Sequence, residues 1–282
     1  MLTAPSGAFA VTDTLSKLKP NMTPGAGFRR IAAMCGDAFS TQLAQVMTDD
    51  DPEGPHRARV ALRRFRAALS GFSPVIDPAA RREVAGQARG LFRCLGRLRD
   101  ADVLLAGCID PAAVAGLAAD ADRIRAEVRA ELTAMDATDF APALQARLAG
   151  SNWQRADKRG QRWHRRGLER LGRRALGRAW HACLGHGADL ATLEAEPRHE
   201  LRKDLKTLRY LSEYFASFWP GGRRDRFLTH LRGLQDNLGL LNDLALARML
   251  TDVVAVTAEE AAALSIARRS WKSLQKTGPF WS

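Results

Sequence analysis

Two rows of basic side chains recur in this sequence with one spacing. The pattern occurs at His56, Arg59, Arg63 and Arg66, and 143 residues later at His199, Arg202, Lys206 and Arg209. Steps of three and four residues place each row on one face of a helix, within about 80° for the first row. Because such groups donate hydrogen bonds and carry positive charge, they bind oxyanions. A cationic row built twice indicates a long polyanion as the ligand.

The same offset relates further residues of this chain. The additional pairs are Arg30 and Arg173, Leu62 and Leu205, Phe72 and Phe215, Arg89 and Arg232, Leu91 and Leu234, Leu95 and Leu238, Gly96 and Gly239, and Asp100 and Asp243. Matches of the rarer types (His, Gly, Asp and Phe) at one offset favour a duplicated helical unit of about 120 residues, which is too long for a solenoid repeat.

The expected elements are all helical. Asp51-Pro52, Asp77-Pro78 and Asp110-Pro111 each place a capping carboxylate before a proline suited to the first helical turn. No stretch shows sustained strand alternation. The predicted helices are 26–48, 52–72, 78–108 and 111–135, then 160–187, 195–218, 222–252 and 257–275, with residues 136–159 as a connector.

This pattern predicts an all-α fold of two four-helix bundles packed as one body. We divide the chain into a loose tail (1–25), a first four-helix unit (26–150) and a second one (151–282). Hydrophobic content of 46% and charged content of 26% are typical of a globular protein.

The charge balance indicates the class of partner. The net charge is +12, with 36 Arg against 7 Lys. A positive field of this size favours polyanions, and guanidinium forks match phosphate oxygens, although a GC-rich genome would produce the same Arg bias. The four cysteines show no CxxC pairing, which predicts a reducing, cytoplasmic setting. No apolar run approaches the roughly 18 residues of a membrane span, so we expect no membrane partner.

Other basic residues are candidates to extend a binding groove. Arg89 and Arg232 fall on the third helix of each unit, and Arg30 and Arg173 on the first. Arg162 and Arg166 belong to a basic run, residues 155–178, at the start of the second unit. Part of that run is expected to be solvated surface. For His56 and His199, the alternative to anion binding is a purely structural role. Asp100 and Asp243 are interpreted as carboxylates that orient the arginines, or as core ion pairs.

Catalytic and metal-binding patterns are not found in the sequence. His181-x-Cys183-x-x-His186 has metal-ligand types, but no complementary cluster occurs elsewhere. Glycine-rich phosphate loops, nucleophile elbows and HExxH are absent. We therefore expect no catalytic residue, no metal and no cofactor. Trp153, Trp163 and Trp180 are expected in the core or an interface rather than as base-stacking platforms.

Three segments resemble the CHAD family, the conserved histidine α-helical domain. They are HRARVALRRFRAALSGF (56–72), GRLRDADVL (96–104) and LQDNLGLLND (234–243), and the resemblance covers about residues 26–275. It implies two four-helix bundles related by pseudo-twofold symmetry, around a basic central channel that binds inorganic polyphosphate.

By position, the family's basic motif falls on the two rows and on Arg64. In the second unit Thr207 replaces the second basic residue of the doublet, and Asn242 replaces the Arg of the Arg-Asp pair. The second unit is therefore the weaker match.

The sequence predicts a non-catalytic polyphosphate-binding protein, cytoplasmic and associated with polyphosphate granules. One alternative is a nucleic-acid-binding protein using the same charge, although aromatic residues make up only 7% of the chain. A second is an enzyme acting on polyphosphate or a small triphosphate, which would need acidic metal ligands in the groove. The oligomeric state and the preferred chain length are left open.

Overall fold

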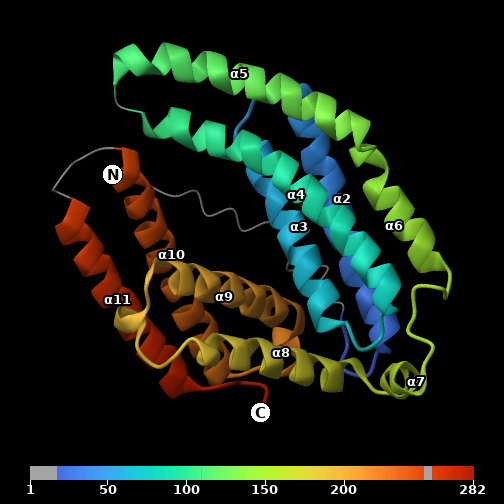
Figure 1. Cartoon of the computed structure of the whole chain (residues 1–282). Helices are drawn as coiled ribbons and strands as arrows, with labels where there is room; N and C mark the ends of the chain where they lie inside the picture. The colour runs from blue at the N-terminus through green and yellow to red at the C-terminus, as the bar shows by residue number, and fades with distance from the viewer. Residues whose placement is uncertain (1–17, 109, 251–255) are drawn as a thin grey trace. The chain divides into compact units, whose positions relative to one another are not determined.

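The helices follow one another in a long series joined by short turns (Figure 1). The computed structural model describes residues 18–108, 110–250 and 256–282, apart from the side chains of residues 191, 195, 242–250 and 256–258. The helices are α2 (Pro24–Thr48), α3 (Glu53–Gly71), α4 (Pro78–Gly107), α5 (Pro111–Ala134), α6 (Phe140–Ala149), α7 (Lys158–His164), α8 (Leu168–Gly185), α9 (Ala195–Phe215), α10 (Gly222–Leu250) and α11 (Val256–Thr277). Within these described residues there is no strand, only an isolated β-bridge between Ile76 and Gln154.

Local capping chemistry sets where several helices begin. The Asp77 carboxylate accepts from the backbone N–H groups of Ala79 and Ala80, at 2.9 and 3.0 Å, ahead of Pro78. Asp110 caps α5 in the same way. These bonds satisfy N–H groups that have no partner inside the helix. The predicted Asp-Pro caps of α4 and α5 are thus confirmed.

The chain divides into two compact units. One consists of Met22–Gly167, and the other of Leu168–Ser282 together with residues 18–21. Residues 151–167 therefore belong with the first helices, whereas the sequence analysis placed them with the second unit. The physical reason is local packing. The backbone N–H of Asp77 bonds the Trp153 carbonyl at 2.8 Å, and the Trp153 ring lies 5.4 Å from that of Phe28.

Two further expectations differ from the structure. The supposed connector 136–159 contains helix α6, held by burial of Phe140, Leu144 and Leu148 along one face. The expected helix 160–187 is interrupted between His164 and Leu168, which gives α7 and α8.

The expected loose tail also differs in its described part. Leu18 is buried, and the Pro20 carbonyl accepts from the backbone N–H of Glu169 at 3.0 Å. Residues 18–21 are therefore packed against the start of α8. Residues 1–17 lie outside the described residues.

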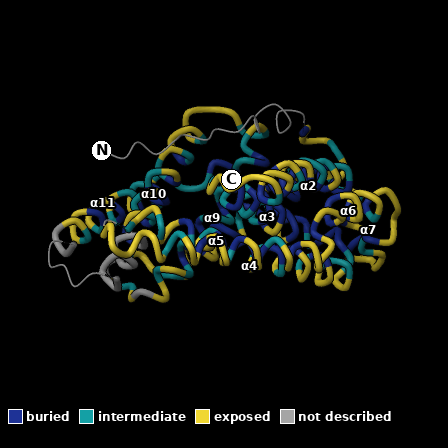
Figure 2. Tube along the Cα trace, turned by 90° about the horizontal axis from the view of Figure 1, so that it is seen from above, coloured by how far each residue is buried: buried dark blue, intermediate teal, exposed yellow. Residues whose placement is uncertain are grey.

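In the Met22–Gly167 unit, one face of α3 is buried in the hydrophobic core. Phe140 of α6 meets Phe39 of α2 and Phe65 of α3 edge-on, at centroid distances of 5.5 and 5.9 Å. Buried and exposed positions alternate along the helices (Figure 2). Burying each large apolar side chain contributes roughly 1.5–3 kcal/mol, so α3 cannot rotate without losing its core contacts. Its basic positions are thereby kept on the opposite side.

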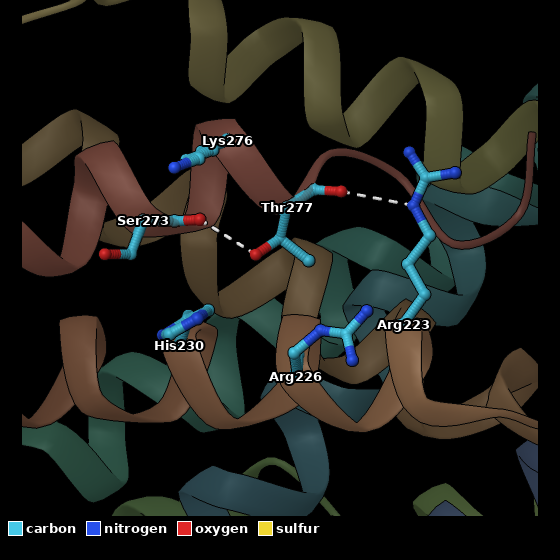
Figure 3. A pocket seen from close by; sticks show the side chains of 6 residues that line it. All are labelled: Arg223, Arg226, His230, Ser273, Lys276 and Thr277. Carbon is cyan, nitrogen blue, oxygen red and sulfur yellow. Dashed lines mark hydrogen bonds between the residues drawn. The ribbon is translucent and has the colours of Figure 1, made fainter.

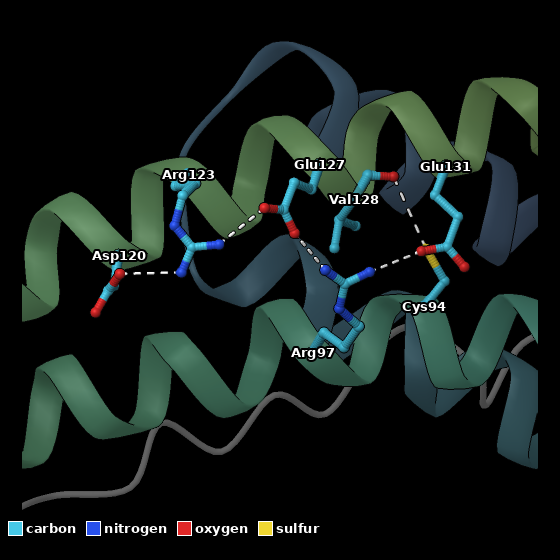
Figure 4. Close-up of polar contacts among 7 residues, drawn as sticks. All are labelled: Cys94, Arg97, Asp120, Arg123, Glu127, Val128 and Glu131. Atoms are coloured by element: carbon cyan, nitrogen blue, oxygen red, sulfur yellow. Dashed lines mark hydrogen bonds and ion pairs between the residues drawn. The ribbon is translucent and has the colours of Figure 1, made fainter.

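Helix α4 is held to α5 by a set of charged side chains (Figure 4). Arg97 of α4 donates to Glu127 and Glu131 of α5, and Arg123 donates to Glu127 at 2.8 Å. The Cys94 thiol contacts the Val128 carbonyl on the same side, at 3.8 Å. Arg97 of α4 is thus paired with carboxylates of α5.

The Leu168–Ser282 unit packs its helices in chain order, α8 on α9, α9 on α10 and α10 on α11. Its core is aromatic: the Trp180 ring lies 5.7 Å from Phe227 and 5.8 Å from Trp271. Trp153, Trp163 and Trp180 are all buried, as the sequence predicted. No helix among the described residues is long and apolar enough to cross a membrane.

Candidate functional site

Six basic side chains gather on adjacent faces of α3 and α4. We call this set the α3/α4 basic face; its members are His56, Arg59, Arg63, Arg66, Arg89 and Arg99. The first four come from the predicted row on α3. Arg89 and Arg99 come from α4, which packs directly against α3.

Arg59 is the most firmly positioned member of this face. Its Nη1 donates to the Phe92 carbonyl at 3.0 Å, and its guanidinium lies 4.1 Å from the centre of the Phe92 ring. Gly96, one turn further along α4, provides the space for this approach, since a Cβ there would overlap Arg59 Nη1. A residue with a side chain at this position would displace the arginine.

Phe92 also bears on a second arginine of the row. The Arg66 guanidinium lies 5.7 Å from the centre of the same ring. Burial and the nearby charge of Arg89 lower the pKa of Arg66. Phe92 therefore helps to hold two guanidinium groups whose charges repel their neighbours.

The charges of the face interact unfavourably in the free protein. Burial lowers the pKa of His56, and the charges of Arg99, Arg63 and Arg59 lower it further, while Glu53 opposes them. Burial also lowers the pKa of Arg59, with Arg63 and Arg99 adding to the effect. Each lowered pKa means that the protonated form costs more free energy at this face than it does in water.

Carboxylates do not neutralise this face. Among the residues that the structure describes, none of the six members takes part in a salt bridge. The buried Nε of Arg63 has no hydrogen-bond partner. Asp100 is exposed and favours the charged form of Arg59 through electrostatic attraction alone. By contrast, Arg97 and Arg123 of the same unit are paired with acidic side chains.

The remaining first-unit candidates are one further residue of α3 and three residues of other segments. Arg64 is half-buried, about 100° around α3 from Arg63. Arg30 is half-buried on α2. Arg166 follows α7 with its guanidinium 4.7 Å from the Trp163 ring centre. Arg162, on α7, is exposed.

The second row lies along α9 with a different set of partners. Arg209 donates to the Glu213 carboxylate at 2.8 Å and to the Gln235 side chain at 3.2 Å. Burial lowers the pKa of Arg209, but the hydrogen bond and charge of Glu213, together with the charges of Tyr210 and Asp236, leave the pKa raised. Arg202 and Lys206 are half-buried, and His199 is exposed. This row has therefore lost part of its free charge to Glu213.

Arg173 and Arg232, the two other predicted site residues of this unit, form contacts with residues close to them. Arg173 on α8 forms an ion pair with Glu169 at 3.2 Å and lies 5.5 Å from the Trp219 ring centre. Arg232 on α10 is exposed, and its Nε donates to the Leu228 carbonyl at 3.3 Å. The side chain of Asp243 lies outside the described residues.

Comparison with known proteins assigns the family. A family model described as the CHAD domain matches residues 30–252. The chain belongs to the CHAD family. The crystal structure of the CHAD domain from the plant Ricinus communis has a similar fold, with a TM-score of 0.69 and 24% identity over 93% of this chain and 90% of that one.

A second structure, PptA from Streptomyces chartreusis, gives a TM-score of 0.47 and 18% identity over 91% of this chain and 99% of that one. A search of curated proteins found no match. The all-α CHAD fold expected from the sequence is confirmed.

Sequence reasoning did not single out Arg99, Phe92 and Gly96 as parts of this CHAD domain's basic face. The internal repeat identifies only those basic residues that have a basic counterpart 143 residues away. Arg99 was not identified because its counterpart is Asn242. A signal was present: Arg89, Phe92, Gly96 and Arg99 are spaced by three, four and three residues, so they share one side of α4.

The two histidines of the possible metal motif, His181 and His186, are held in structural contacts. His186 Nε2 lies 2.9 Å from Asp204 Oδ2, and His181 Nδ1 lies 2.7 Å from the Gly177 carbonyl. Burial raises the pKa of the Cys183 thiol and raises that of Cys94 to about 12, so both remain protonated. Among the described side chains, no group of three or more His, Cys, Asp or Glu is arranged to hold a metal ion.

Proposed function

We propose that this CHAD protein binds inorganic polyphosphate through the α3/α4 basic face. The observation that carries the proposal is the clustering of six basic side chains without a bonded carboxylate. Assembling these charges destabilises the free protein electrostatically, and a bound anion removes the repulsion. The His, Arg and Lys side chains expected from the sequence at the second row are proposed as additional contacts.

The dimensions of the face favour a linear polyanion. The α3 row runs from His56 to Arg66, which is about 15 Å of helix at 1.5 Å per residue. One cation per turn follows from this spacing, and Arg89 and Arg99 add cations from α4 beside it. Every phosphorus along a polyphosphate chain carries a negative charge. Consecutive phosphates can therefore meet successive members of the face.

The aromatic content of the face favours polyphosphate over nucleic acid. Proteins that bind single strands offer exposed rings on which bases stack. The ring on this face is that of Phe92, and Arg59 and Arg66 lie against it. It therefore serves the arginines rather than a base.

The proposed role is binding without catalysis, in the cytoplasm and at polyphosphate granules. Phosphoryl transfer needs metal ligands or a positioned nucleophile at the phosphate. The acidic groups coupled to this face are Asp100, which interacts with Arg59, and Glu53, which interacts with His56. Incubating the protein with polyphosphate and Mg²⁺ or Mn²⁺ tests this point, and time-dependent release of orthophosphate would contradict it. That both rows line one groove stays a prediction.

The binding test replaces two cations whose side chains form no hydrogen bond or ion pair with the described residues. Arg63→Ala with Arg99→Ala removes charge from the face while leaving Arg59 on Phe92. We expect polyphosphate affinity, measured by calorimetry, to fall at least tenfold, which corresponds to about 1.4 kcal/mol. The log–log slope of affinity against salt should also shrink by about 1.4, at about 0.7 per lost phosphate contact.

The matched control is Arg123→Ala with Arg147→Ala. It removes the same net charge from ion-paired positions on α5 and α6. Equal loss of affinity in both double variants would show that only net charge matters, and would refute the site. DNA and RNA competing as strongly as polyphosphate at fixed salt would support the nucleic-acid alternative.

A further inference from the structure

A separate basic pocket lies in the Leu168–Ser282 unit, between the first turns of α10 and the last turns of α11 (Figure 3). Its volume is about 350 Å³, and it is lined by Arg223, Arg226, His230, Ser273, Lys276 and Thr277. None of these residues belongs to the rows predicted from the sequence.

Two hydrogen bonds shape one wall of the pocket. Arg223 Nε donates to the Thr277 carbonyl at 3.1 Å, and the Thr277 hydroxyl donates to the Ser273 carbonyl at 2.9 Å. Arg223 thus caps a carbonyl at the end of α11, where helices favour positive charge. Its two terminal nitrogens remain as donors, and the Ser273 hydroxyl adds another.

The other basic side chains of the pocket form no such hydrogen bond among the described residues. In the described part of the chain, the side chains of Arg226, His230 and Lys276 form neither a hydrogen bond nor an ion pair, and no carboxylate lines the pocket. The adjacent Arg224 is different, because its Nη2 pairs with Asp225 at 2.7 Å. Arg224 is therefore neutralised by a carboxylate, whereas Arg226 and Lys276 in the pocket are not paired with one among the described residues.

The helix ends do not explain this concentration of charge. Arg223 and Lys276 lie near the carbonyl groups that end α11, where positive charge stabilises a helix, so these two residues are explained by the helix end. Arg226 and His230 project from the second and third turns of α10, toward the side of α11 that carries Ser273 and Thr277 (Figure 3). Arg226 thus adds a charge, and His230 a further polar ring, beyond what capping of α11 requires.

We propose that this pocket is a second anion site, which takes a phosphate group or a short oligophosphate. Its volume is at the low end of the 300–1,000 Å³ that is typical of ligand pockets, so it suits a compact ligand rather than a long polymer. Guanidinium forks from Arg223 and Arg226 contact phosphate oxygens in pairs, and Lys276 supplies a point charge. The ligand is either a free small phosphate compound or the end of a polyphosphate chain.

Calorimetric titration of the full chain with pyrophosphate tests the proposal. Arg226→Ala with Lys276→Ala should weaken pyrophosphate binding at least tenfold. The matched control is Arg224→Ala with Lys272→Ala, which removes the same charge from neighbouring positions outside the pocket. The Arg63→Ala, Arg99→Ala variant should bind pyrophosphate like the unmodified protein. A failure of the pocket proposal can therefore be distinguished from a failure of the proposal for the α3/α4 basic face. Circular dichroism of each variant confirms folding.

Polyphosphate with free ends and with chemically blocked ends separates the two ligand sources. If the pocket takes a chain end, Arg226→Ala with Lys276→Ala weakens binding of free-ended chains more than that of blocked chains. If it takes a free small phosphate compound, pyrophosphate binding falls and both polymers are unaffected. Pyrophosphate and polyphosphate affinities equal to those of the Arg224→Ala, Lys272→Ala control would overturn the proposal.

Discussion

Replacing Gly96 with alanine tests how the α3/α4 basic face is assembled. A Cβ at position 96 would overlap Arg59 Nη1, which is the far end of a flexible side chain. We therefore expect Arg59 to move while the backbone of α4 stays in place. The arginine then loses its bond to the Phe92 carbonyl and its position over the Phe92 ring.

The expected cost follows from these contacts. A hydrogen bond from a charged donor contributes about 1.5–3 kcal/mol, and a cation–π contact about 0.5–2 kcal/mol. Alanine in place of glycine within a helix returns about 1 kcal/mol. Gly96→Ala should thus lower the free energy of unfolding of this unit by about 1–4 kcal/mol.

Two matched variants isolate the cause. Gly86 lies on the same helix, and a Cβ added there would meet no other atom within 4 Å, so Gly86→Ala should stabilise the protein by up to about 1 kcal/mol. In an Arg59→Ala background the overlap is gone, and Gly96→Ala should become stabilising by a similar amount.

Urea denaturation followed by circular dichroism measures these changes. Hydrogen exchange of peptides from α3 and α4 assigns them to the correct unit. A Gly96→Ala protein as stable as Gly86→Ala would refute the reasoning, since Arg59 would then have no fixed contact to lose.

Three further outcomes are expected. Burial and the charges of Arg99 and Arg63 lower the pKa of His56, and bound phosphates oppose that repulsion. Affinity for long polyphosphate should therefore rise as pH falls through the region of 6.5 and below, and His56→Gln should reduce this rise in calorimetry; an unchanged rise would contradict the role of His56. Arg125→Ala leaves the buried Asp102 without the partner at 2.9 Å, and should cost about 3–5 kcal/mol in urea denaturation; a loss below about 1 kcal/mol would contradict a buried pair. Gly239→Ala should be tolerated without loss of thermal stability, because Arg202 Nη2 lies 3.7 Å from the added carbon, an ordinary contact; a lowered melting temperature would contradict this.

Local interactions explain why part of the fold was predictable. The Asp77 and Asp110 caps act over two or three residues, so the starts of α4 and α5 could be predicted from the dipeptides alone. Helix α6 was missed although Phe140, Leu144 and Leu148 repeat every four residues. Its burial depends on Phe39 and Phe65, which are far away in sequence, and the neighbouring small and polar residues indicated a connector.

The sequence by itself determined that four basic side chains share one side of α3, because helical periodicity depends only on residues three and four apart. Only the tertiary structure decided which of them stay free of carboxylates. Packing of α4 on α3 brings Arg99 toward His56, and Gly96 lets Arg59 reach the Phe92 carbonyl. Contacts of this kind depend on which helix faces pack together. That choice is made by burial of the whole core, and no single segment encodes it.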